Sequence, residues 1–222
     1  MAGPVNGTVE LVKSRDPEVR NHKKFSGVVV WLEPLGAAAS QVVLDTRPLA
    51  IMSQKMKMFT PHVLAIPAGA SVDFPNFDPI FHNAFSSYSG QVFDVGLYPP
   101  GRSRTVTFKR EGVVRVFCNI HSTMSAVIVV LKTPYFAVSD DSGHFAIPDV
   151  PPGEYRVHVY HERALPQTLK ALEQCVKVTA DALEIQPLVI SETGYVQTPH
   201  QNKYGMDYSS TEDQLLYSRE SK

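Results

Sequence analysis

The side chains best suited to bind a metal lie in the seven residues from Cys118 to Met124, which read Cys-Asn-Ile-His-Ser-Thr-Met. Cys118 offers a thiolate, His121 an imidazole and Met124 a thioether, and an apolar segment lies on either side of them. A trigonal set of two histidines and one cysteine, with a long axial methionine, is typical of copper sites that exchange one electron. The loop supplies three of these four ligands, so a second histidine must come from another part of the chain.

We predict that this histidine is His82, in the segment Phe-His-Asn-Ala-Phe. The alternative for Cys118 is a disulfide with Cys175, the other of the two cysteines in the chain. Two cysteines are too few for a disulfide-dense scaffold. A single disulfide stays possible, but three partner ligands in register with Cys118 favour a metal. The predicted metal site is one copper ion bound by His82, Cys118, His121 and Met124.

A second metal site at His144, His158 and His161 is the other histidine cluster that we considered. His158 and His161 are three residues apart in a predicted strand, which places them on opposite faces. We therefore do not expect a metal there, and the chain has no further residue set that would indicate an enzyme.

The elements around these residues are predicted to be strands. Seventeen prolines and thirteen glycines separate short segments rich in Val, Ile, Phe and Tyr, a pattern typical of β-sandwiches and barrels. One short helical stretch is expected at 165–174. The predicted fold class is all-β, with strands at 8–12, 27–33, 50–56, 63–66, 71–74, 105–108, 113–117, 126–131, 144–147, 155–160, 174–178 and 183–190.

Residues 42–131 resemble the cupredoxins, the plastocyanin and amicyanin family of type 1 (blue) copper proteins. The matching motifs are Phe59-Thr60-Pro61, Ala68-Gly69-Ala70, Val72-Asp73-Phe74-Pro75-Asn76, His82-Asn83, Tyr98-Pro99-Pro100-Gly101 and the Cys-x2-His-x2-Met loop. The resemblance implies a Greek-key cupredoxin sandwich and electron transfer to a redox partner, such as a c-type cytochrome or an oxidoreductase.

The resemblance also implies roles for residues beside the ligands. Asn83 would tie its own loop to the cysteine loop, and Phe85 and Phe117 would keep the site dry. His121 would reach the surface as the electron port, inside an apolar face formed by Ile120, Met124, Pro99 and Pro100.

A second resemblance lies in the C-terminal half. The segment Asp-x-x-Gly-x-Phe-x-Ile at 140–147 and the turn Pro-Pro-Gly-x-Tyr at 151–155 resemble carboxypeptidase regulatory-like, or transthyretin-like, sandwiches. The opening strands of that family have counterparts at 7–9 and 27–32. We therefore predict a smaller sandwich of residues 7–35 and 133–190, with the cupredoxin (36–132) inserted into it or joined to it. An extended polar tail follows at 191–222, which could be anchored by Tyr195, Tyr204, Tyr208 and Tyr217.

Charge and hydropathy exclude several function classes. The chain has 21 basic and 22 acidic residues and a net charge of −1, and no basic run that would indicate a nucleic-acid partner. No apolar run is long enough to span a membrane, and the N-terminus lacks a signal peptide. We interpret the chain as a periplasmic electron carrier whose signal peptide has been removed, the alternative being a copper-delivery protein without a redox partner.

Overall fold

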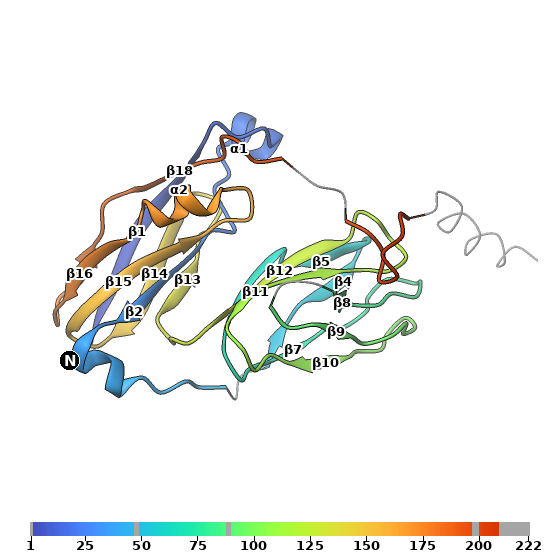
Figure 1. The fold of residues 1–222 in the computed structure, drawn as a ribbon, viewed down its shortest axis with the longest axis horizontal. Coiled ribbons are helices and arrows are strands. Elements are labelled where there is room, and N and C mark those ends of the chain that lie inside the picture. The colour runs from blue at the N-terminus through green and yellow to red at the C-terminus, as the bar shows by residue number, and fades with distance from the viewer. Residues whose placement is uncertain (1, 47–48, 88–89, 197–199, 209–222) are drawn as a thin grey trace, which may run out of the picture. The chain divides into compact units, whose positions relative to one another are not determined.

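The computed structural model describes residues 2–46, 49–87, 90–196 and 200–208 (Figure 1). Strands dominate these residues, and the helices are short: α1 (Pro17–His22), the 3-10 helix η1 (Gly36–Gln41) and α2 (Pro166–Lys170). The predicted all-β fold class is confirmed. The chain divides into two compact units, unit 1 with residues 1–44 and 132–197, and unit 2 with residues 45–131 and 198–222.

Unit 1 is a pair of sheets that enclose one core. The first sheet contains β1 (Gly3–Val12), β14 (His144–Val150), β17 (Leu183–Glu184) and β18 (Leu188–Ser191), and the second contains β2 (Val29–Pro34), β13 (Phe136–Val138), β15 (Gly153–Tyr160) and β16 (Gln174–Val178). Alternate residues of these strands are buried, as in β15, where Tyr155, Val157 and Val159 point into the core. This alternation is typical of a strand with one face on a core and the other toward solvent.

Both N-terminal strands belong to unit 1. Strand β1 pairs antiparallel with β14, where Gly7 faces Phe145, and β2 pairs antiparallel with β15. This is the pairing that the insertion hypothesis requires. The predicted ranges 7–35, 36–132 and 133–190, as independently folding domains, stay a prediction.

Unit 2 contains the cysteine loop. Its largest sheet has the order β6 (Val63–Pro67), β12 (Ser125–Leu131), β11 (Gly112–Phe117), β8 (Phe85–Ser86) and β9 (Phe93–Asp94). A second sheet has the order β10 (Thr105–Thr107), β7 (Ser71–Asp73) and β3 (Ala50–Ile51), and β4 (Ser53–Lys55) forms a hairpin with β5 (Met58–Thr60). Cys118 and Met124 are part of the core that these strands enclose.

Among the described residues, no helix has the length and apolar character that a bilayer crossing needs.

Candidate metal centre

The cysteine loop is the connection between the two central strands of unit 2. Strand β11 ends at Phe117 and β12 begins at Ser125, and these two residues face each other in the antiparallel pair. Two backbone hydrogen bonds fold the loop back on itself, from Cys118 N to the Met124 carbonyl oxygen (3.1 Å) and from Met124 N to the His121 carbonyl oxygen (3.1 Å). The loop is therefore a compact turn that holds its three donor residues together.

Strand pairing brings His82 to the same loop. Phe85, at the start of β8, pairs with Phe117 at the end of β11, and His82 forms an isolated bridge with Tyr98 on its other side. Both backbone hydrogen bonds of this bridge are present. The histidine segment is thus fixed between two neighbours, directly beside Cys118.

The structure brings three of the four predicted ligands together. Cys118 Sγ lies 3.8 Å from His82 Nδ1 and 3.6 Å from His121 Nδ1, and the three donor atoms all lie within 4.8 Å of one another. With bond lengths like those of zinc, about 2.1 Å to nitrogen and about 2.3 Å to sulfur, a trigonal ion would hold N and S about 3.8 Å apart. The spacing of the donors therefore fits a metal ion at their centre.

The site is closed to water. His82, Cys118 and Met124 have no exposed surface, and His121 is 3% exposed. The Phe85 and Phe117 rings pack at 5.9 Å between centroids, and both are buried, as the resemblance implies. A buried set of soft and imidazole donors suits copper in either oxidation state.

Asn83 makes the contact that the resemblance implies. Its side-chain oxygen accepts a hydrogen bond from Asn119 N (2.5 Å), in the cysteine loop. On the other side, its carbonyl oxygen accepts a weaker bond from the buried Gln54 amide (3.4 Å). Asn83 thereby ties the histidine segment to the cysteine loop.

Asp78 faces the other side of the His82 ring, where its Oδ2 lies 2.8 Å from His82 Nε2. Burial acts to raise the pKa of Asp78, but hydrogen bonds from the Lys57 amide, the His82 ring and the Met56 amide outweigh it and hold the pKa below its ordinary value. Burial lowers the pKa of His82, against the opposing effect of Asp78. At neutral pH these shifts favour a carboxylate that accepts the Nε2 proton of a neutral ring, which leaves Nδ1 free to face Cys118.

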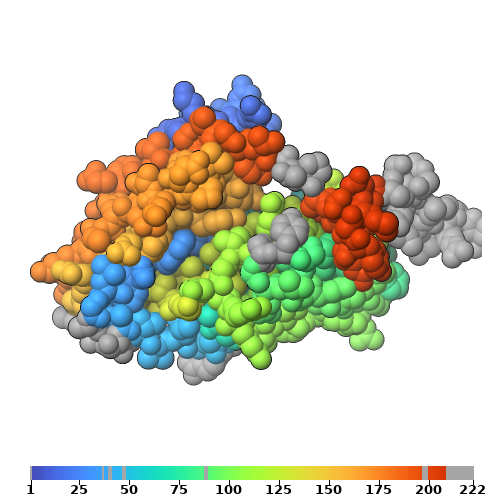
Figure 2. All heavy atoms as spheres, in the orientation of Figure 1, coloured from blue at the N-terminus to red at the C-terminus, as the bar shows by residue number. Residues whose placement is uncertain are grey.

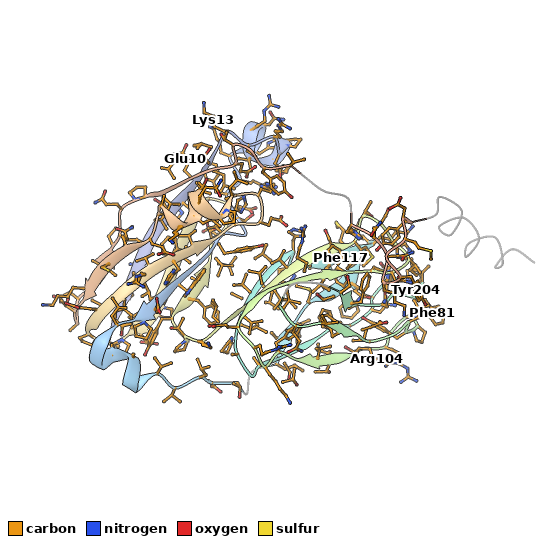
Figure 3. The ribbon with its side chains drawn as sticks, in the orientation of Figure 1. Glu10, Lys13, Phe81, Arg104, Phe117 and Tyr204 are labelled. Carbon is orange, nitrogen blue, oxygen red and sulfur yellow. The ribbon has the colours of Figure 1, made fainter. Side chains whose placement is uncertain are left out.

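The C-terminal segment, residues 200–208, packs on the cysteine loop. The Tyr208 hydroxyl donates to the Cys118 carbonyl oxygen (2.7 Å), Lys203 N donates to Asn119 Oδ1 (2.9 Å), and the His200 ring lies 4.2 Å from the Phe117 ring. In Figure 2 the red atoms of this segment lie against the green atoms of unit 2, and Figure 3 labels Tyr204 and Phe117 in this region.

This packing corrects two sequence-based expectations. His121 does not reach the surface, because it is only 3% exposed, and Met124 is fully buried and so cannot belong to an apolar docking face. In the predicted extended tail, 191–222, Ser191 is the last residue of β18 and residues 200–208 make the contacts above. Tyr217 lies outside the described residues.

The alternative sites are not formed. Cys118 is buried, Cys175 is exposed, and the two form no disulfide with each other. His158 has a carboxylate at each ring nitrogen, Glu33 at 2.8 Å and Glu173 at 3.2 Å, whereas His161 contacts Glu192. Among the described residues, His82, Cys118 and His121 form the one group of three or more His, Cys, Asp or Glu side chains close enough together to hold a metal ion.

Asp78 and His200 were not predicted from the sequence, whereas Tyr208 was among the tyrosines expected to anchor the tail, and its hydroxyl bonds the Cys118 carbonyl oxygen. Asp78 precedes His82 by four residues in a loop, where this spacing has no fixed geometry. His200 lies in a polar segment without periodicity, so no local pattern singled it out.

Comparison with family models gives one match, to domain II of polysaccharide lyase family 4, over residues 130–184. That range lies almost entirely in unit 1 and is not the carboxypeptidase regulatory-like family of the sequence-based expectation, which stays a prediction. Comparison with curated proteins gives no match.

Several solved structures resemble about half of the chain or less. A copper-containing nitrite reductase from Thermus scotoductus is 25% identical, with a TM-score of 0.36, over 45% of this chain and 27% of the reductase. A purple cupredoxin from Nitrosopumilus maritimus is 23% identical, with a TM-score of 0.34, over 37% of this chain and 99% of that protein. Amicyanin from Paracoccus versutus is 18% identical, with a TM-score of 0.36, over 46% of this chain and 97% of amicyanin.

Proposed function

We propose that this protein is a one-electron carrier with a single type 1 copper ion, held by His82 Nδ1, Cys118 Sγ and His121 Nδ1, with Met124 as the axial ligand. The observation that carries the proposal is the buried group of two ring nitrogens at 3.8 and 3.6 Å from one thiol sulfur. Copper bound there would supply a Cu(I)/Cu(II) couple. The residues around it keep the donors in one arrangement, so that a change of charge needs little movement.

The closed site supports a carrier over a copper-delivery protein. A delivery protein must pass the ion itself to its receiver, and so needs at least one ligand that an incoming donor atom can replace. His121 is only 3% exposed here, and the C-terminal segment contacts Phe117, Cys118 and Asn119 just before it in the chain. An electron, in contrast, crosses a thin layer of protein without any ligand exchange.

The proposal includes a redox protein as partner, for example a c-type cytochrome or an oxidoreductase, and no reaction on a substrate. A site with three or four protein ligands and no open position has no place for a substrate atom, unlike catalytic metal sites, which keep one. The proposal also includes a periplasmic location, where cytosolic thiols do not compete for copper.

The test is to add Cu(II) to the reduced metal-free protein and to record absorption and electron paramagnetic resonance spectra. A thiolate-to-copper band in the visible region is expected in the wild type and is expected to be lost in Cys118→Ser. Met124→Leu should keep the band and raise the reduction potential, because the thioether donor stabilises Cu(II) more than Cu(I).

Cys175→Ser is the matched control, because Cys175 is exposed and lies in unit 1. This variant should keep the full spectrum. A colourless wild-type protein would refute the copper proposal. A coloured protein without a reversible potential would refute the carrier and favour delivery.

A further inference from the structure

Asp78 contacts both the proposed ligand His82 and the turn between β4 and β5. Its Oδ2 lies 2.8 Å from His82 Nε2, the ring nitrogen that faces away from Cys118. His82 is fully buried and Asp78 is 7% exposed. A hydrogen bond between such groups is stronger than in water, because the surroundings have a low dielectric constant.

Two backbone amides hold the Asp78 carboxylate in place. Met56 N donates to Oδ1 (2.6 Å) and Lys57 N donates to Oδ2 (2.8 Å). Asp78 N in turn donates to Asn76 Oδ1 (3.0 Å). The carboxylate is therefore fixed from two sides before any metal binds.

The turn that supplies these amides has an unusual backbone. Met56 and Lys57, between β4 and β5, both have a φ of 55°, a left-handed conformation that is costly for residues other than glycine. The β4–β5 turn keeps this conformation with two side chains where glycine is the usual residue. Its hydrogen bonds to Asp78 stabilise the conformation, and the turn in return orients the carboxylate.

We propose that Asp78 is a positioning residue for the copper ligand: its carboxylate holds His82 in the Nε2–H tautomer, fixes the ring so that Nδ1 faces the metal, and strengthens Nδ1 as a donor. The inference about copper rests on the proposed function, whereas the inference about the tautomer does not. A carboxylate behind a ligand histidine raises the basicity of the ring. The more highly charged Cu(II) gains most from a stronger donor and a nearby negative charge, so Asp78 lowers the reduction potential.

The first measurement needs no metal. Nitrogen-15 chemical shifts of the His82 ring in the reduced metal-free protein report which nitrogen carries the proton. We expect one tautomer, Nε2–H, in the wild type and in Asp78→Asn, whose amide oxygen can still accept that proton. A mixture of tautomers is expected in Asp78→Leu, which has no acceptor.

The second measurement uses the copper-loaded protein. Loss of an outer partner of a ligand histidine typically weakens metal binding by about 10- to 100-fold, and here the loss should fall mainly on Cu(II). If Cu(II) binding weakens tenfold more than Cu(I) binding, the potential rises by about 59 mV for one electron. We expect a rise in Asp78→Asn, which removes the charge, and a larger rise in Asp78→Leu, which also removes the hydrogen bond.

Two controls separate this effect from others. Asp73→Asn removes a carboxylate from the same unit that bonds Thr105 Oγ1 (2.8 Å) and contacts no ligand, and it should leave potential and tautomer unchanged. Met56→Gly with Lys57→Gly should keep the turn without help from Asp78, because glycine adopts positive φ readily. The potential rise in Asp78→Asn should therefore persist when both glycines are added.

The outcomes distinguish this inference from the proposed function. Equal potentials in Asp78→Asn, Asp78→Leu and Asp73→Asn would overturn the role of Asp78 while leaving the copper site intact. A wild-type protein that binds no copper would refute the proposed function, and the positioning role would then depend on the tautomer alone. A mixture of His82 tautomers in the wild type would overturn the positioning role of Asp78.

Discussion

Buried charged residues in this protein are held by several partners each. Glu192, which follows β18 in unit 1, shows this outside the metal centre. Its Oε1 contacts His161 Nε2 (3.0 Å) and Arg163 Nε (3.1 Å), and its Oε2 accepts a hydrogen bond from the Ser14 hydroxyl (2.7 Å). Because these residues follow three different strands, the carboxylate links three chain segments.

The charge of Glu192 should make unit 1 sensitive to acid. Burial acts to raise the pKa of Glu192, but the hydrogen bonds from His161 and Ser14 and the charge of Arg163 outweigh it, so the pKa lies below its ordinary value of 4.5. The folded chain therefore takes up this proton less readily than the unfolded chain. The stabilisation is fully present above pH 4.5 and is lost as the pH falls toward the lower folded-state pKa.

The variant Glu192→Gln tests whether the charge of Glu192 makes unit 1 sensitive to acid. We expect the variant to lower the free energy of unfolding by about 2 kcal/mol at pH 7, the loss typical of hydrogen bonds to a charged group. The difference from the wild type should narrow as the pH falls below 4.5. Glu10→Gln, at an exposed position of β1 labelled in Figure 3, should cost nothing measurable. Denaturant unfolding across the pH range measures the free energy of unfolding of both variants. A difference between wild type and Glu192→Gln that stays constant with pH would contradict the role of the Glu192 charge.

At the scale of elements, the C-terminal segment, residues 200–208, packs on the loop that carries the metal centre. Besides its contacts with the cysteine loop, Lys203 Nζ lies 2.8 Å from Asp94 Oδ2. Within the segment, the Asn202 side chain accepts hydrogen bonds from the Tyr204 and Met206 amides, which forms a tight turn. The segment thus has its own local structure and covers the loop that carries His121.

Removing residues 198–222 should therefore open the metal centre. We expect the truncated protein, loaded with copper and reduced to Cu(I), to pass its electron several-fold faster to ferricyanide, which becomes ferrocyanide, because the oxidant can approach the cysteine loop more closely. Tyr208→Phe is the finer test, since it removes only the hydroxyl that bonds the Cys118 carbonyl oxygen, and it should give a smaller acceleration. The rate is measured by stopped-flow absorbance of the thiolate band. Equal rates in all three proteins would show that the segment does not limit access.

At the scale of the whole molecule, the features that could be predicted are those set by residues close together in the sequence. The spacing Cys-x2-His-x2-Met sets a compact turn, and period-2 alternation identifies strands such as β15, so both could be predicted from neighbouring residues. Helix α1 also had a local signal that the analysis missed: Asp16 caps the helix by accepting from Glu18 N (2.9 Å), and Pro17 opens it. The prediction failed for the exposure of His121, which is 3% exposed. The packing of its loop includes contacts with residues far along the chain, such as Lys203 with Asn119, 84 residues apart, and neighbouring residues carry no signal of such contacts.

The two units have separate hydrophobic cores. The core of unit 1 includes Val30 and Tyr155 and is formed entirely by residues of that unit, and the core of unit 2, with Phe74 and Cys118, is likewise its own. Burial of apolar surface is the main stabilising contribution to folding. Two separate cores therefore predict two unfolding transitions.

Copper should move only one of these transitions. The single tryptophan, Trp31, lies on β2 and stacks on the His158 ring at 5.1 Å, so its fluorescence reports the unfolding of unit 1. The thiolate band reports unit 2. At free copper 100 times above its dissociation constant, binding to the folded state adds about 2.7 kcal/mol, which for a domain of this size raises the melting temperature by roughly 11–22 °C. Circular dichroism follows the strands of both units, in the metal-free and the copper-loaded protein. We expect the shift in the circular-dichroism transition that tryptophan fluorescence does not follow, and no shift in the tryptophan transition. Cys118→Ser is the control, because it should abolish the shift in unit 2. A tryptophan midpoint that rises together with that of unit 2 would mean that the chain unfolds as one cooperative body, and would reject the two-core argument.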